Sequence, residues 1–281
     1  MKKGLFGVQM MIFREKVKEL GIYEVMKKLA QIGYHCVEIS QIEMSPENVK
    51  AIRKACDDFD MVVASMSAYL EPDIDWGVYA EYLSSDYQKI VNDCKYLDCK
   101  ILRIGMLPFS CLGSFDKVLQ FAKDADEMAA RLKKDDDIDF YYHAHQFEFV
   151  KYDGKFLLDI IRDNTEYLGF ELDTYWLQDG GVYPVDFIKT YAGRVRLLHL
   201  KDYRIAEPTG KEDAFSRKLY QFAEVGEGNL PMKKCIEAGL ESGAEYFLVE
   251  QDDTYGRDPF ESMQISYNNL VEMGFSDWFN Q

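Results

Sequence analysis

The sequence is short of basic residues and has no long apolar run, and each absence excludes a class of protein. Asp and Glu outnumber Lys and Arg by 49 to 33, which gives a formal net charge of −16. Proteins that bind nucleic acid rely on clustered Lys and Arg, so the composition argues against a nucleic-acid partner. No apolar run approaches the roughly 20 residues that a membrane span requires, so no membrane partner is expected.

The cysteines lack the spacing of a disulfide framework or of a CxxC site. There are six of them in 281 residues, and scattered cysteines in a chain of this size are typical of reduced thiols, which predicts a cytoplasmic protein. The apolar stretch near the start follows two lysines, as in a signal peptide, but no small-residue cleavage site follows it. We interpret this stretch as a first strand.

The chain also lacks a linker rich in Pro, Gly or Ser, which predicts a single domain over residues 1–281. It instead repeats one theme, a β-branched or aromatic run followed by a polar loop and a stretch with helical periodicity. The eight predicted strands are residues 3–9, 36–40, 61–67, 100–105, 139–145, 168–173, 195–200 and 246–251. The longest irregular piece is expected at 203–228.

Strands that alternate with helices are parallel, and eight such units in roughly 250 residues predict a (β/α)₈ TIM barrel. A doubly wound sheet is the alternative, but it usually has fewer strands and a Gly-rich first turn. Start signals support two of the helices, because Ser45-Pro46 and Asp258-Pro259 each place a capping residue before a proline at the first helical position. A third helix is predicted over 113–134, with one apolar face.

Polar residues gather where the predicted strands end, which is the catalytic face of such barrels. Candidates at these ends include Glu38, His143, His145, Asp173, His199 and Glu250, so three of the four histidines lie there. Three of these residues have an ordinary alternative role: Asp173 as a helix N-cap, His199 as a neutral core histidine, and Glu250 in a salt bridge. Three carboxylates and an imidazole that converge would repel each other unless a divalent cation neutralised them. Mn²⁺ is the first expectation for one bound ion, with Mg²⁺, Zn²⁺ and Co²⁺ as alternatives.

Several ordered motifs resemble one known family over nearly the whole chain. They are YHAHQFEF (142–149), ELDTYW (171–176), LLHLKD (197–202), VGEGNL (225–230) and LVEQD (248–252), with GYHCVEIS (33–40) and GVQM (7–10) in support. These motifs are similar to those of the sugar phosphate isomerase/epimerase group of xylose isomerase-like TIM barrels. The group includes sugar epimerases, inosose isomerases and dehydratases, hydroxypyruvate isomerases and endonucleases that act at abasic sites.

The resemblance implies one divalent metal held by residues after strands five to eight. Carried over, the ligands would be Glu148, Asp173, His199 and Glu250. Strand five departs from the pattern, because epimerases of the group carry a glutamate at the strand tip and this chain does not. The resemblance therefore leaves Glu148 and His145 as alternatives for the fourth ligand. The abasic-site endonucleases need more histidines than the four present, which, together with the acidic charge, argues against that activity.

The resemblance also implies a mechanism on a small-molecule sugar or cyclitol. The metal would polarise a carbonyl and stabilise a cis-enediolate, with Glu250 as the base and Glu148 or His145 returning the proton. Loss of hydroxide from the same intermediate would make the enzyme a dehydratase. The residues expected to contact the substrate are His143, His145, Lys201, Glu38, Arg103 and Trp176.

Two other functions remain open at this point. One is a lyase or dehydratase that acts on a 3-keto sugar or an inosose, with a second subunit as an option. The other is a barrel that binds a sugar without turnover, which an incomplete set of metal ligands would favour. Members of the family are often dimers or tetramers, so the resemblance leaves a homo-oligomer open.

Overall fold

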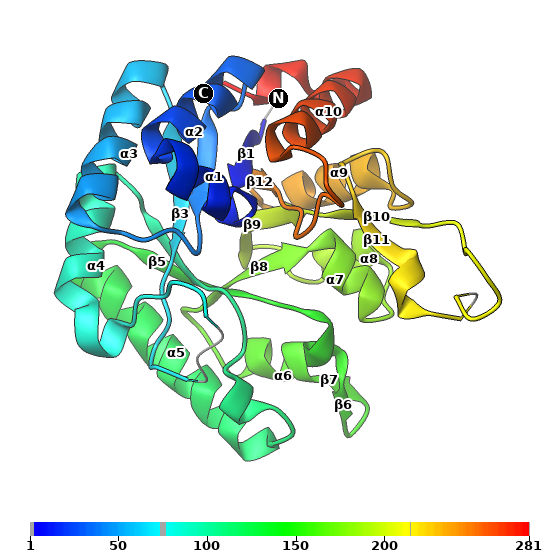
Figure 1. The fold of residues 1–281 in the computed structure, drawn as a ribbon. Coiled ribbons are helices and arrows are strands. Elements are labelled where there is room, and N and C mark those ends of the chain that lie inside the picture. The colour runs from blue at the N-terminus through cyan, green and yellow to red at the C-terminus, as the bar shows by residue number, and fades with distance from the viewer. Residues whose placement is uncertain (1–2, 74–76, 214, 281) are drawn as a thin grey trace.

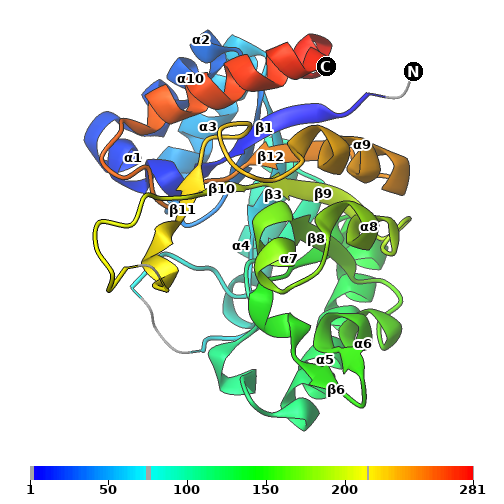
Figure 2. The same ribbon diagram turned by 90° about the vertical axis from the view of Figure 1, so that its right-hand side faces the viewer.

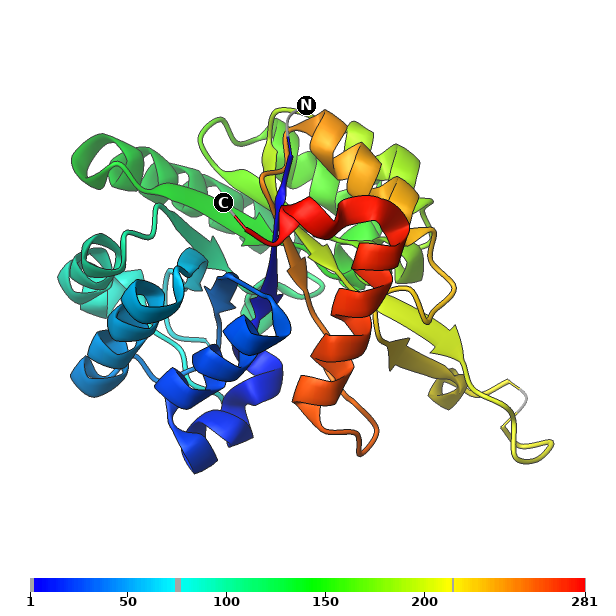
Figure 3. The same ribbon diagram turned by 90° about the horizontal axis from the view of Figure 1, so that it is seen from above.

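Eight parallel strands close into a barrel in the spatial order β1-β12-β9-β8-β5-β4-β3-β2 (Figures 1–3). The structure is a computed structural model that describes residues 3–73, 77–213 and 215–280. The strands are β1 (Leu5–Gln9), β2 (Cys36–Ile39), β3 (Val62–Ser67), β4 (Ile101–Ile104), β5 (Asp139–His143), β8 (Gly169–Asp173), β9 (Val195–Leu200) and β12 (Tyr246–Val249). Each lies within one of the eight predicted ranges, and the predicted (β/α)₈ barrel is confirmed.

Helices surround the barrel and connect its strands (Figures 1 and 3). They are α1 (Arg14–Leu20), α2 (Ile22–Ile32), α3 (Pro46–Phe59), α4 (Leu83–Leu97), α5 (Phe115–Asp136), α6 (Leu157–Asp163), α7 (Thr174–Asp179), α8 (Pro184–Lys189), α9 (Met232–Ser242) and α10 (Pro259–Leu270). The predicted caps are confirmed: Ser45 accepts a hydrogen bond from the Asn48 N–H, and Asp258 accepts one from the Phe260 N–H. In the described part of the chain, no helix has the length and apolar character needed to cross a membrane.

The region expected to be irregular contains a β-hairpin. Strand β10 (Asp202–Ile205) pairs antiparallel with β11 (Tyr220–Ala223), and the hairpin projects from the barrel (Figure 3). Residue 214, in the loop between them, lies outside the described residues. A second small antiparallel pair, β6 (Lys151–Tyr152) with β7 (Lys155–Phe156), follows β5.

The inside of the barrel changes from apolar to charged along the strands. The layer nearer the amino ends of the strands is a buried apolar cluster made by Cys36, Ala64, Ile101, Tyr141, Leu197 and Leu248. Side chains two residues apart point to the same face of a strand. Two positions after five of these six residues stand Glu38, Arg103, His143, His199 and Glu250, all of them buried. The alternation therefore delivers charged groups to one layer inside the barrel mouth.

Candidate metal centre

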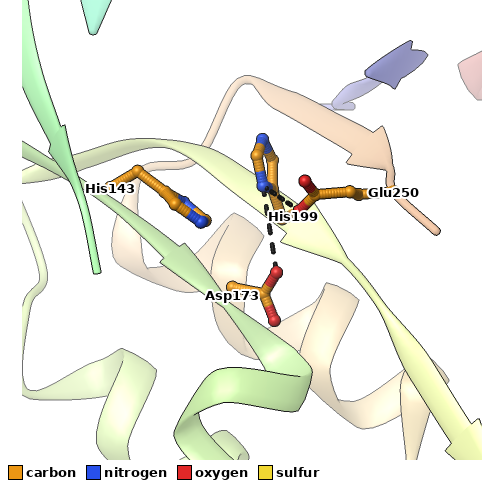
Figure 4. A group of neighbouring side chains, drawn as sticks. All are labelled: His143, Asp173, His199 and Glu250. Carbon is orange, nitrogen blue, oxygen red and sulfur yellow. Dashed lines mark ion pairs between the residues drawn. The ribbon is translucent and has the colours of Figure 1, made fainter. Parts of the chain in front are cut away.

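Four side chains from neighbouring strands converge at the carboxyl ends of the barrel (Figure 4). His143 and Asp173 end β5 and β8, His199 lies in β9, and Glu250 follows β12. One ligand atom from each lies within 4.8 Å of the others. The Nδ1 atom of His199 is 2.7 Å from Glu250 Oε2 and 3.9 Å from Asp173 Oδ2. We call these four residues the metal group.

Unpaired polar atoms in the metal group fit a bound cation. Asp173 Oδ2, His199 Nδ1 and Glu250 Oε2 are buried and make no hydrogen bond within the described structure. A buried polar atom without a partner carries a free-energy cost, which coordination of an ion would remove. Asp173 also caps α7, because its Oδ1 accepts hydrogen bonds from the N–H groups of Tyr175 and Trp176. Asp173 can therefore serve both as the N-cap of α7 and as a metal ligand.

The pKa values of the two carboxylates in the metal group also favour a bound cation. Burial raises the pKa of Asp173 well above its usual value, and the charge of Glu250 adds to the effect. Burial would also raise the pKa of Glu250, but Lys201 and His199 hold it well below its usual value. Without a metal the two carboxylates thus resist ionising together, whereas a divalent cation between them would favour both as anions. The residues present fit a divalent metal ion.

His143 completes this group in place of Glu148. Burial, followed by the charge of His199, lowers the pKa of His143 well below its usual value, so its imidazole is neutral and has a free lone pair. The structure does not bring Glu148 into the metal group. Its carboxylate instead contacts the Tyr142 hydroxyl and accepts a hydrogen bond of 3.0 Å from the His145 N–H. Glu148 thereby holds the 3₁₀ turn at Gln146–Phe149, which directs the carboxylate back to its own loop.

Because Glu148 is buried, the stability of the folded protein should depend on pH. Burial raises the pKa of Glu148 from 4.5 to about 8, against the lowering effect of the hydrogen bond with Tyr142. Between these values the folded protein keeps a proton that the unfolded chain loses, so stability should fall as pH rises from about 4.5 to 8. The Glu148→Gln variant should lack this loss, which is on the order of 5 kcal/mol.

The measurement is the melting temperature of both proteins at pH 5 and pH 9. The drop between the two pH values should be smaller in the variant than in the wild type. Glu19→Gln, which removes a carboxylate that is 64% exposed, is the control and should keep the wild-type drop. Equal drops in the wild type and the Glu148→Gln variant would contradict a protonated Glu148.

Glu38 and Arg103, which were expected to contact substrate, lie beneath the metal group and bind each other. The Arg103 Nε and Nη2 atoms donate to Glu38 Oε1 at 2.8 and 2.6 Å, and neither residue is more than 2% exposed. Glu38 Oε1 also lies 3.0 Å from His199 Nε2. These contacts give the pair a supporting position under His199.

Two further residues of the site were missed in the sequence. Glu171 lies in β8 with one carboxylate oxygen 3.1 Å from His199 Nε2, and Gln9 donates from Nε2 to Glu250 Oε1 at 3.0 Å. The available signal for Glu171 is its spacing of two residues before Asp173, which places both side chains inside the barrel. The signal for Gln9 is weaker: it is the last residue of β1 and so lies at the same rim of the barrel.

A cation and several rings form one wall beside Glu250. Lys201 Nζ lies 2.7 Å from Asp252 and 3.6 Å from Glu250, and it lies over the Trp176 ring at 4.7 Å from its centre. The His145 ring lies between that of Trp176, at 5.1 Å, and that of His143, at 4.7 Å. His145, Lys201 and Trp176 are therefore placed next to the metal group, as a contact with substrate would require.

Asp202 has a structural position rather than one in the metal group. Its carboxylate accepts hydrogen bonds from the backbone N–H groups of Tyr203, Gly226, Gly228 and Leu230. These bonds fasten the loop at 225–230 to the end of β9. The glycines of this loop thus form a turn around a carboxylate.

A cavity of about 320 Å³ lies apart from the metal group. It is bounded by segments that follow β3 and β4 and by α5, and its lining includes Tyr69, Ile104, Met106 and Phe121. No residue of the metal group lines it.

Comparison with known proteins agrees with this architecture. A curated inosose dehydratase from Clostridium botulinum (strain Alaska E43 / Type E3) is 22% identical over 265 residues, which is 84% of each chain. A solved sugar phosphate isomerase/epimerase from Parabacteroides distasonis has a TM-score of 0.70 at 21% identity and covers 98% of this chain and 96% of its own. The solved IOLI protein with a bound zinc atom has a TM-score of 0.70 at 14% identity, with 100% of both chains covered.

These structural similarities, at low identity, concern the fold. Membership of a family is shown by a match at the level of sequence pattern, which runs over residues 26–266 and so spans most of the barrel. The match agrees with the resemblance inferred from the strand-end motifs. The chain belongs to the xylose isomerase-like TIM barrel family.

Proposed function

We propose that this protein is a metal-dependent enzyme that removes a proton next to the carbonyl of a keto sugar, sugar phosphate or cyclitol. Isomerisation or epimerisation would follow when the proton returns at the neighbouring carbon or on the other face. The observation that carries this proposal is the metal group, in which two carboxylates and two imidazoles meet at the catalytic end of the barrel. A complete set of four candidate ligands favours an enzyme over a barrel that only binds sugar.

His143, Asp173, His199 and Glu250 would hold the metal. When bound, the ion would supply Lewis acidity toward the carbonyl oxygen of the substrate. The donor set has two nitrogen ligands, whereas the sequence suggested one. Because imidazole suits zinc and similar ions and carboxylates suit magnesium and manganese, we propose Zn²⁺ or Co²⁺ ahead of Mn²⁺.

Glu250 is the proposed base. Lys201 and His199 keep its carboxylate ionised, and the hydrogen bond from Gln9 fixes one of its oxygens. His145 is the proposed group that returns the proton, because its ring lies beside that of His143 at 4.7 Å. Burial lowers its pKa, so it would take up a proton from solvent for the transfer and be neutral again afterwards. Lys201 and Trp176 would contact substrate hydroxyls and the apolar face of the sugar ring.

A second candidate function is dehydration, and the residue at the tip of strand five favours it. Epimerisation through two carboxylates needs an acid or base of similar strength on each side of the substrate, but His143 stands where the second carboxylate would be. Elimination of water needs one base for the proton and one donor for the departing hydroxyl. Glu250 would take the proton from carbon, and His145, once it has taken up a proton, would give it to the departing hydroxyl.

The test uses the metal-loaded protein, a panel of keto sugars and inososes, and D₂O as solvent. Isomerisation or epimerisation should give a product of unchanged formula that carries solvent deuterium, whereas dehydration should give a product that has lost water. The Glu250→Gln variant should lose deuterium exchange by more than about 100-fold, because the amide cannot accept the proton. Equal exchange in both proteins would contradict the role of Glu250.

A further inference from the structure

One buried carboxylate in β8 faces both histidines of the metal group. Glu171 is fully buried, with Oε1 at 3.1 Å from His199 Nε2 and Oε2 at 3.4 Å from His143 Nδ1. Its Oε2 also lies 3.0 Å from Arg103 Nε. Glu171 itself is not a member of the metal group, because it lies on the opposite side of the His199 ring from Glu250.

We propose that Glu171 is a positioning residue that fixes the tautomers of His143 and His199. It would accept the N–H of His199 Nε2 and the N–H of His143 Nδ1, one with each carboxylate oxygen. The nitrogen left with a lone pair would then be Nδ1 in His199 and Nε2 in His143. This inference rests on the proposed metal site, and it deepens that site by explaining how two imidazoles present the correct nitrogen to one ion.

The orientation of the His199 ring supports this assignment. Its Nδ1 atom faces Glu250 at 2.7 Å, so this nitrogen is on the side of the metal group. Its Nε2 atom faces away from Asp173 and Glu250, toward Glu171 and Glu38. A metal ion at Nδ1 would displace the second proton of His199, and a carboxylate at Nε2 holds the remaining N–H on the other side of the ring.

Glu38 reaches the same nitrogen but has other partners. Its Oε1 accepts two N–H groups of Arg103, and its Oε2 accepts the Ser65 hydroxyl. Both oxygens of Glu171 are buried and make no hydrogen bond of good geometry within the described structure. Among the described residues, the side-chain partners of Glu38 include Ser65, Arg103 and His199, whereas Glu171 lies beside both histidine rings. Glu171 is therefore the carboxylate that can pair with both histidines, in addition to its ion pair with Arg103.

The first test measures metal binding without any substrate. Co²⁺ is titrated into the metal-free wild type, Glu171→Gln, and the control Glu224→Gln, and its affinity and visible absorption are recorded. A glutamine has one accepting oxygen and cannot accept from both rings, so Glu171→Gln should bind Co²⁺ about 10–100-fold more weakly and with an altered spectrum. Glu224 is buried but pairs with Arg257 and Ser262, so Glu224→Gln should behave like the wild type.

The second test needs no variant at position 171. Long-range ¹H–¹⁵N correlation spectra of the Zn²⁺-loaded wild type report which nitrogen of each histidine carries a proton. The four histidines of the chain make assignment by single replacements practicable. The expected result is a proton on Nε2 of His199 and on Nδ1 of His143.

The outcomes separate this inference from the proposed function. Wild-type affinity and spectrum in Glu171→Gln, or a proton on the other nitrogen of either histidine, would overturn the role of Glu171 and leave the metal site standing. Failure of the wild-type protein to bind Co²⁺ would overturn the metal site and this inference together. Weaker Co²⁺ binding by Glu171→Gln, together with the expected histidine tautomers in the wild type, would support both the metal site and the role of Glu171.

Discussion

The His199→Ala variant should lose divalent metal binding and turnover while keeping the fold. His199 lies between Asp173 and Glu250 on one side and Glu38 and Glu171 on the other, so it joins the metal group to the carboxylates beneath it. Loss of an outer partner of a ligand typically costs about 10–100-fold in metal affinity, so loss of the ligand itself should cost more than about 100-fold. Turnover should fall at least as far, because the carbonyl would no longer be polarised.

Elemental analysis after dialysis and titration with Co²⁺ measure the binding, and circular dichroism checks the fold. The matched control is His35→Ala, since His35 lies before β2 and its Nδ1 contacts the backbone carbonyl of Phe59 at 2.8 Å. This control should bind one metal ion with wild-type affinity. Stoichiometric, tight binding by His199→Ala would show that the ion sits elsewhere or that the metal group is only an ionic network.

The same measurement distinguishes the two candidates for the ligand from strand five. His143→Ala should weaken Co²⁺ binding, because His143 lies in the metal group. Glu148→Gln should leave binding unchanged, because the Glu148 carboxylate is held by Tyr142 and the His145 N–H. The reverse result would restore Glu148 as the ligand that the family resemblance suggested.

The fold was predictable from the sequence because each strand has a buried, β-rich pattern and each connection is long enough for a helix. The ends of the strands were predictable for the same reason, and they led to Asp173, His199 and Glu250. The hairpin at β10 and β11 was not predicted, because each strand has only four residues, which is too short for an alternating pattern to stand out. It forms through pairing with a segment some 20 residues away, which local pattern does not reveal.

The site was less predictable, for reasons that particular residues illustrate. His143 was assigned to substrate because the family pattern supplied a glutamate as ligand, although its spacing of two from the buried Tyr141 already placed it inside the barrel. Glu171 was missed because it lies two residues before the end of β8, whereas catalytic residues of such barrels are expected at the ends of the strands. Glu148 lies beyond the end of β5, in the 3₁₀ turn at Gln146–Phe149. The regular alternation of a strand does not continue there, so the sequence does not predict the direction of its side chain.

Arg103→Met should cause a large loss of stability. Arg103 is 2% exposed and its guanidinium contacts Glu38 at 2.6 and 2.8 Å and Glu171 at 3.0 Å. Methionine preserves much of the side-chain volume but leaves two buried carboxylates without their cation. Removal of one partner from a buried ion pair typically costs about 3–5 kcal/mol, because the remaining charge is desolvated and unpaired. The melting temperature should fall by roughly 10 °C.

Arg196→Met is the matched control for this loss. Arg196 binds Asp139 and Glu245 at the other end of the barrel, but its side chain is 31% exposed and the stranded carboxylates would remain solvated. Pairs of this kind contribute about 0–1 kcal/mol, so the control should shift the melting temperature by only a few degrees. Adding Glu38→Gln to Arg103→Met should recover part of the loss, since it removes one of the unpaired charges. Equal losses in the two arginine variants, without recovery in the double variant, would mean that Arg103 contributes through packing and not through its charge.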